Sequence, residues 1–183
     1  MKLSGLHLLL TYQCTFECEH CFVWGSPWQS GVMNLAQLHE ILRQAREMEG
    51  LDWIYFEGGE PFLYYPILLR GVQMATAMGF HIGIVSNAYW ATTEADALSW
   101  LKPFADLIED LTISSDLYHY SETNSDLTLN AAAAAAAGAP VLSSSLSAWS
   151  CSCCHRVEHA STDLSPTASS TLKQPSRPSS SSP

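Results

Sequence analysis

Three cysteines stand within eight residues, in the segment Cys14-Thr-Phe-Glu-Cys18-Glu-His-Cys21. Thiolates bind zinc and iron–sulfur clusters, and three so close together suit a single inorganic centre better than a set of disulfides. Iron–sulfur clusters usually take four cysteine ligands, and no fourth cysteine stands nearby. One iron of a cubane cluster would therefore lack a protein ligand and could bind a small chelating molecule.

Polar residues also follow three other strand-like runs. The first group is Gly58-Gly59-Glu60-Pro61, in which Glu60 could hold an ammonium group by a charge-assisted hydrogen bond. The same four residues are also compatible with an ordinary strand-to-helix turn. The other two groups are Ser86-Asn87 and Ser114-Ser115-Asp116. Hydroxyl, amide and carboxylate groups at such positions are common in α/β loops and are candidates for cofactor binding.

The elements that must position these groups alternate along the chain. Apolar runs predict strands at residues 6–12, 52–56, 81–86 and 111–114, the first of them apolar on both faces. Between them the pattern predicts helices that begin after the caps Asn34 and Thr93, and at about residue 66. In the helix that follows Thr93, Leu98 and Leu101 should face inward. Strands alternating with helices indicate an α/β fold with a parallel sheet, whose strands end at one edge. We therefore expect the cysteines and the three polar groups to meet there.

The C-x3-C-x2-C triplet, followed by a strand that ends in Gly-Gly-Glu-Pro, resembles the radical S-adenosylmethionine (radical SAM) enzymes. The resemblance covers residues 6 to about 120. It implies a partial (β/α) barrel, here truncated to about four parallel strands where the family usually has six βα units. It also implies that Cys14, Cys18 and Cys21 hold a [4Fe-4S] cluster with S-adenosylmethionine on the open iron. The family reaction reduces the sulfonium by one electron, and the resulting 5′-deoxyadenosyl radical abstracts hydrogen from a substrate, which is unknown here.

Site residues follow from the same resemblance, position by position. Gly58, Gly59 and Glu60 would contact the amino group of the methionine moiety. The strand end Ser86-Asn87 would lie under the cofactor, and Ser114 and Asp116 would contact the ribose hydroxyls. Trp24 and Trp28 would either cover the cluster or pack as an apolar lid on the barrel rim.

Two alternatives stay open at this point. The first is a zinc-stabilised, non-enzymatic interaction domain, with His20 or a distant residue as the fourth ligand. The second is a truncated, inactive product, because four strands leave out the units that complete the cofactor pocket in the family. Whether this chain is a competent enzyme is therefore an open question at the level of sequence.

The family resemblance and the composition together limit the partners and the location that we expect. The family mechanism implies a one-electron donor of the flavodoxin or ferredoxin type, and its substrates include peptides, cofactor precursors and glycyl-radical partner proteins. Residues 1–130 carry a net charge of −11, which argues against a nucleic-acid-binding surface. No apolar run is long enough for a membrane span, and no convincing secretory signal is present. We expect a cytoplasmic location.

The chain divides in composition near Asn130. Residues 1–130 contain 18 of the 19 aromatic residues and are predicted to form the core domain. Residues 131–183 contain 31 Ser, Ala and Pro among 53 positions, so we expect a disordered, low-complexity tail. A second metal site formed by Cys151, Cys153, Cys154, His155 and His159 is not expected, because such a segment provides no rigid surroundings for the ligands. An alanine run starts at Ala131, and a change of reading frame there is our hypothesis for this composition. Translation of the other two frames would test it.

Overall fold

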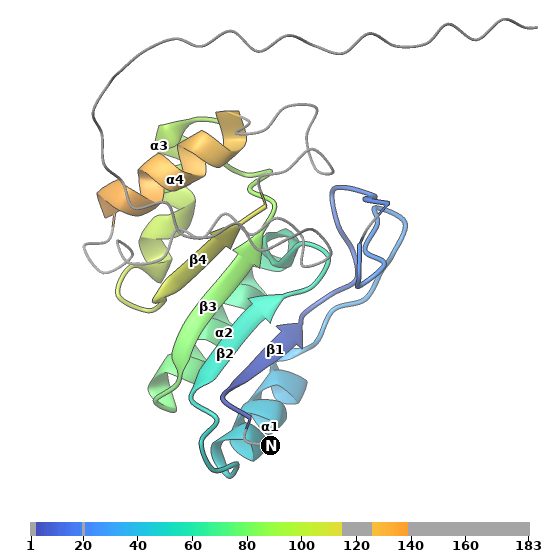
Figure 1. Ribbon diagram of the computed structural model, residues 1–183, viewed down its shortest axis with the longest axis vertical. Helices are drawn as coiled ribbons and strands as arrows, with labels where there is room; N and C mark the ends of the chain where they lie inside the picture. The colour runs from blue at the N-terminus through green and yellow to red at the C-terminus, as the bar shows by residue number, and fades with distance from the viewer. Residues whose placement is uncertain (1–2, 20, 115–125, 139–183) are drawn as a thin grey trace, which may run out of the picture.

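The computed structural model describes residues 3–19, 21–114 and 126–138. Its centre is one sheet of four parallel strands in the order β1-β2-β3-β4 (Figure 1). The strands are β1 (Gly5–Leu9), β2 (Trp53–Glu57), β3 (His81–Ser86) and β4 (Asp110–Ile113). Each strand pairs with the next one along the chain, as short right-handed connections in α/β folds favour. The predicted α/β class with four parallel strands is confirmed.

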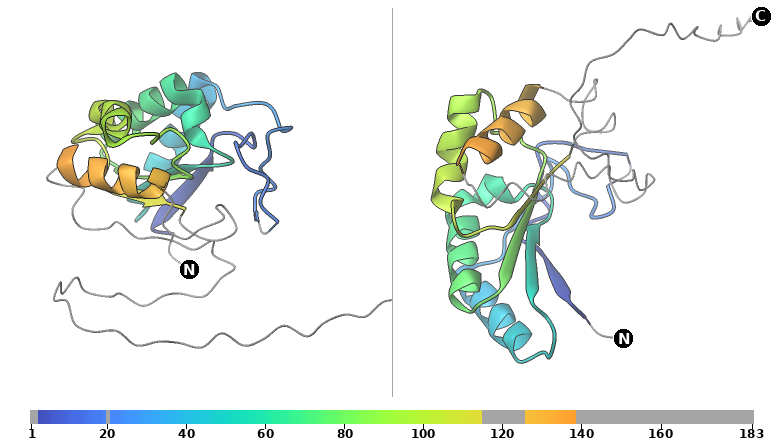
Figure 2. Two further views of the ribbon diagram at one scale, coloured as in Figure 1. Left: turned by 90° about the horizontal axis from the view of Figure 1, so that it is seen from above. Right: turned by 60° about the vertical axis from the view of Figure 1, so that its left-hand side comes forward.

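The helices cover one face of this sheet (Figure 2). They are α1 (Leu35–Arg46), α2 (Tyr65–Ala77), α3 (Glu94–Leu101) and α4 (Asp126–Gly138), with short 3₁₀ helices η1 (Pro61–Tyr64) and η2 (Lys102–Phe104). Strand side chains that face the helices are apolar and buried, for example Ile54, Phe56 and Ile84. They pack on apolar positions of the helices to form the core. This burial is the main force that holds the helices on the sheet.

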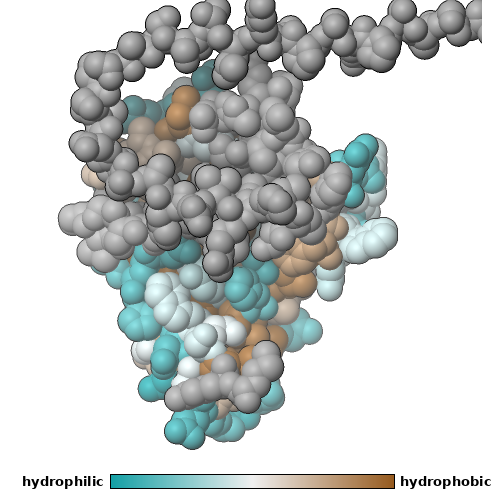
Figure 3. All heavy atoms as spheres, in the orientation of Figure 1, coloured by the Kyte–Doolittle hydropathy of each residue, from teal (hydrophilic) through white to brown (hydrophobic). Residues whose placement is uncertain are grey.

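The opposite face of the sheet carries a row of stacked rings. His7 stacks on Tyr55 at 4.8 Å between ring centroids, and Trp53 stacks on both Tyr55 and His81. In Figure 3, which views this face, apolar side chains gather along the β1 edge. The side chain of His7 is 56% exposed, so β1 is not buried on both faces as its sequence suggested. Side-chain alternation along the strand places His7 on the face opposite Leu8, away from the helices.

Helix boundaries follow the predicted caps. The Asn34 side chain accepts from the backbone N–H of Gln37, and the Gln37 side chain accepts from the N–H of Asn34 in return. Thr93 caps α3 by accepting from the N–H of Asp96. The prediction for Leu98 is wrong, because its side chain is 39% exposed, whereas Leu101 is buried as expected.

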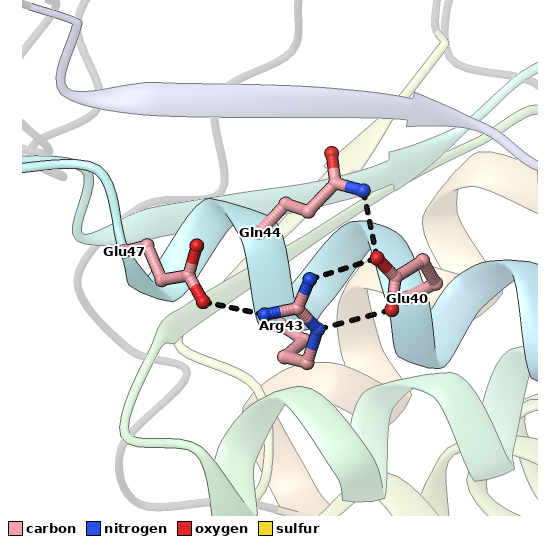
Figure 4. Close-up of polar contacts among 4 residues, drawn as sticks. All are labelled: Glu40, Arg43, Gln44 and Glu47. Carbon is pink, nitrogen blue, oxygen red and sulfur yellow. Dashed lines mark hydrogen bonds and ion pairs between the residues drawn. The ribbon is translucent and has the colours of Figure 1, made fainter.

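The solvent face of α1 carries a network of charged and polar side chains (Figure 4). The guanidinium of Arg43 donates to the carboxylates of Glu40 and Glu47, and Gln44 donates to Glu40. These side chains are exposed, and pairs at helical spacing on a surface contribute little to stability. The network thus belongs to the surface of α1.

Helix α4 begins before the expected domain boundary at residue 130 and continues through the alanine run. Ala131, Ala134 and Ala135 are buried, and Asn130 donates to the carbonyls of Ala91 and Thr92 near the start of α3. Alanine has the highest helix propensity, and one methyl-lined face suffices for close packing against a neighbouring helix. Residues 139–183 lie outside the described part of the chain. No described helix is both long and apolar enough to cross a bilayer.

Candidate functional site

The three cysteines lie on the loop between β1 and α1, which we call the cysteine loop (residues 10–34). Its two limbs are tied together by backbone hydrogen bonds. Ser26 N–H donates to Tyr12 C=O, Cys14 N–H donates to Ser26 C=O, and Met33 N–H donates to Leu10 C=O. A further backbone bond, from Cys21 N–H to Cys18 C=O, turns the chain between the second and third cysteines. The loop is therefore an ordered platform at the carboxyl end of β1.

The thiols of Cys14, Cys18 and Cys21 are partly exposed and not joined in disulfides. Two of the sulfurs accept backbone hydrogen bonds, Cys21 Sγ from Gly25 N–H at 3.2 Å and Cys14 Sγ from Phe16 N–H at 3.5 Å. Burial raises the pKa of Cys14, which favours the neutral thiol until a metal replaces the proton.

This donor set fits an iron–sulfur cubane. Each cysteine that holds a cubane binds a different iron, so the three cysteine sulfurs need not converge on one point. A structural zinc site instead needs four ligands around a single ion. Among the described residues, no three His, Cys, Asp or Glu side chains converge on a position for a single metal ion. His20, the fourth zinc ligand considered above, lies outside the described residues.

The turn Gly58-Gly59-Glu60 packs directly on the cysteine loop. Gly59 N–H donates to Thr11 C=O at 2.7 Å, and Glu60 N–H donates to Gln13 C=O at 2.9 Å. A Cβ on Gly59 would lie 2.2 Å from the carbonyl oxygen of Gln13, and one on Gly58 would lie 2.4 Å from that of Thr11. The two glycines are thus required for close approach to the backbone of the cysteine loop, Gly58 at Thr11 and Gly59 at Gln13, next to Cys14.

A third glycine, Gly25, belongs to the same contact and was missed in the sequence. A Cβ on Gly25 would lie 3.1 Å from Gly59 Cα and 3.4 Å from Cys14 Cβ. Gly25 therefore lets the returning limb of the cysteine loop lie against the Gly59 turn. In the sequence, neither hydrophobic periodicity nor a known motif marks Gly25, which stands between Trp24 and Ser26, as part of the site.

The carboxylate of Glu60 is turned inward and is fully buried. Its oxygens accept from Phe62 N–H at 3.0 Å, Asn87 N–H at 2.8 Å and the Ser86 hydroxyl at 3.0 and 3.2 Å. Burial raises the pKa of Glu60 to about 7, against the opposing effect of these donors. Because these donors occupy both oxygens, the carboxylate ties the end of β2 to the end of β3.

The remaining predicted site residues belong to the ends of β3 and β4, and the structure gives them different surroundings. Ser86 is buried, and its oxygen also accepts from Ala88 N–H and Trp90 Nε1–H, so it is an internal link. The amide of Asn87 reaches the cysteine loop, where it donates to Thr15 Oγ1 and Cys14 Sγ. Ser114 follows β4 and its N–H donates to Ser86 C=O, which keeps it at the same edge of the sheet. Asp116 lies outside the described residues.

The two tryptophans of the cysteine loop do not form a packed lid. Trp24 is 81% exposed and Trp28 is 83% exposed. The expectation that they pack on the rim is wrong, because neither ring is buried against the sheet, whereas the expectation that they cover the cluster stays a prediction. Their exposure leaves an aromatic surface beside the cysteines.

Replacement of Glu60 by glutamine should destabilise the fold by about 2 kcal/mol near pH 6, because an amide nitrogen cannot accept from Phe62 N–H or Asn87 N–H. Urea unfolding of the reduced protein would measure this. The matched control is Glu40→Gln on α1, whose carboxylate is exposed and should matter far less. Equal effects of the two substitutions would contradict the structural role of Glu60.

The same carboxyl predicts a pH dependence of stability. Its pKa of about 7 lies above the ordinary 4.5, so the folded chain keeps a proton that the unfolded chain releases. This contribution is full below pH 4.5 and is lost as the pH rises to about 7, by roughly 3 kcal/mol in total. The difference in unfolding free energy between wild type and Glu60→Gln should therefore shrink as the pH rises through this range. A difference that stays constant with pH would contradict the raised pKa.

Comparison with known proteins identifies the family to which this chain belongs. The sequence profile of the Radical SAM superfamily matches residues 8–128. YydG of Bacillus subtilis (strain 168), provisionally named a peptide biosynthesis protein, is 27% identical over 111 residues, which are 60% of this chain and 35% of YydG. The tungsten-containing aldehyde ferredoxin oxidoreductase cofactor-modifying protein of Pyrococcus furiosus is 33% identical over 111 residues, 60% of this chain and 30% of the relative.

The chain spans about a third of the length of the curated relatives it matches first. Among solved structures, one described as native anSMEcpe with bound AdoMet and Cp18Cys peptide aligns with a TM-score of 0.49 and 20% identity. That alignment covers 74% of this chain and 39% of the other. The family match ends two residues before Asn130, the position at which composition changes.

Proposed function

Because this chain belongs to the radical SAM superfamily, whose cofactors are a [4Fe-4S] cluster and S-adenosylmethionine, we propose that it builds the front half of a radical SAM active site. In this proposal Cys14, Cys18 and Cys21 each bind one iron of the cluster. The observation that carries it is the ordered cysteine loop at the carboxyl end of β1, with three partly exposed thiols within the matched region. When bound, the cofactors supply one-electron cleavage of the sulfonium C–S bond, which gives methionine and a 5′-deoxyadenosyl radical.

The role of the Gly58-Gly59-Glu60 turn is to seat the methionine end of S-adenosylmethionine. The carboxylate of Glu60 is occupied by internal donors, so the backbone of the turn is the part that remains to contact the amino group. Glu60 contributes by holding the turn in place between Phe62 and Asn87. Ser114, together with Asp116, is proposed to contact the ribose from the end of β4.

An external donor and a substrate complete the reaction. The partly exposed cysteine loop is the proposed contact surface for a flavodoxin or ferredoxin, from which the reducing electron would come. For the substrate we propose a peptide, since a relative of this chain is named for peptide biosynthesis. In this proposal the peptide would be the hydrogen donor of the family reaction.

Anaerobic reconstitution with iron and sulfide tests the proposal. We expect a brown protein with about four iron ions per chain, and cleavage of S-adenosylmethionine to 5′-deoxyadenosine after reduction with dithionite. A colourless protein that binds one zinc ion instead would support the alternative of an interaction domain. A brown protein that does not cleave S-adenosylmethionine would support the alternative of an inactive product.

A further inference from the structure

The end of β3 sends one side chain into the cysteine loop. Asn87 is 4% exposed, and its Nδ2 lies 3.5 Å from Cys14 Sγ and 3.0 Å from Thr15 Oγ1. The first distance is normal for a hydrogen bond to sulfur, because sulfur has a larger radius than oxygen. A buried side chain from a strand distant in sequence therefore contacts a proposed cluster ligand.

The orientation of this amide is determined by its other contacts. The Asn87 Oδ1 atom accepts from Tyr89 N–H at 3.1 Å, so the oxygen end is already occupied. The nitrogen end must then point toward Cys14 and Thr15, both of which can accept. Its backbone is held as well, since Asn87 N–H donates to Glu60 at 2.8 Å. The donor is thus preorganised by groups outside the cysteine loop.

A hydrogen bond to a cluster sulfur acts on the redox state. Reduction adds negative charge to the cluster and its thiolates, so a donor to sulfur stabilises the reduced state more than the oxidised state. Burial of the donor strengthens this effect, because the local dielectric constant is low. The backbone donors Phe16 N–H and Gly25 N–H would act in the same direction but are present whatever the side chain.

We infer that Asn87 is a positioning residue for the cluster, an inference that rests on the proposed function. The Asn87 amide holds Cys14 in place and raises the reduction potential of the cluster. It acts through Cys14 and not by direct contact with S-adenosylmethionine. The residue thereby reduces the driving force that the electron donor must supply.

The test is the midpoint potential of the reconstituted cluster, measured by a redox titration followed by electron paramagnetic resonance. In Asn87→Ala, the ratio of reduced to oxidised cluster at a fixed potential should fall about fivefold to tenfold, tenfold being about 59 mV for one electron. Asn87→Asp should lower the ratio further, because a carboxylate beside the thiolate replaces a donor by a negative charge.

Two control variants separate this effect from others. Asn34→Asp adds the same charge on the exposed cap of α1, where Asp can still accept from Gln37 N–H, and its potential should equal that of the wild type. Thr15→Val removes the second contact of the Asn87 amide but leaves its bond to Cys14, so its potential should stay close to the wild type.

Three outcomes overturn the inference. In the first, Asn87→Ala holds a full cluster at the wild-type potential. In the second, Thr15→Val lowers the potential as much as Asn87→Ala does. In the third, both Asn87 variants fail to hold a cluster while Thr15→Val retains it, which would assign Asn87 to assembly alone. A wild-type chain that binds no cluster would overturn the proposed function itself, and the two failures are therefore distinguishable.

Discussion

Replacement of Cys18 by alanine is expected to abolish the iron–sulfur cluster. With two cysteines left on the loop, the cluster would keep fewer protein ligands than its three coordinated irons require. Iron bound after anaerobic reconstitution should fall from about four per chain to near zero, and cleavage of S-adenosylmethionine should be lost with it. Cys14→Ala and Cys21→Ala should give the same result.

The tail provides a matched control for this experiment. Cys151→Ala removes one thiol from a segment that the family match does not include, so iron content should stay at the wild-type level. Equal loss of iron in Cys18→Ala and Cys151→Ala would mean that the cluster is not held by the cysteine loop. Retention of iron in all three loop variants would contradict the assignment of the ligands.

Replacement of Gly59 by alanine should have the largest effect on folding. The new Cβ would be 2.2 Å from the Gln13 carbonyl oxygen, which is backbone and cannot rotate away. The turn must then separate from the cysteine loop, with loss of the bond from Gly59 N–H to Thr11 C=O. We expect a loss of about 3 kcal/mol in unfolding free energy. Denaturant unfolding of the reduced protein measures it.

The control for Gly59 is Gly31, on the same loop. Gly31 has a φ of +92° but nothing within 4 Å of its missing Cβ, so Gly31→Ala meets backbone strain without a clash. It should cost about 1 kcal/mol and leave cluster assembly intact. If Gly59→Ala were no worse than Gly31→Ala, the close packing of the turn on the cysteine loop would be wrong.

The alanine run shows what composition alone leaves out. Seven consecutive alanines look like low complexity, and the expected boundary at residue 130 treated them as tail. In the structure Ala131, Ala134 and Ala135 recur at helical spacing and are buried. Composition averages over a segment, whereas packing depends on which face a residue presents. The frame-change hypothesis remains a prediction.

The amino-acid sequence by itself determined the order of strands and helices, because apolar periodicity and caps such as Asn34 and Thr93 act over a few residues. It also predicted the proposed ligand set, since Cys14, Cys18 and Cys21 are close along the chain. Only the tertiary structure decided that the Glu60 carboxylate faces inward, that Gly25 packs on Gly59 and that Asn87 donates to Cys14. Each of these contacts joins segments far apart in the chain, and their geometry depends on how the strand ends and the loop pack together. No local sequence pattern encodes the geometry of these contacts.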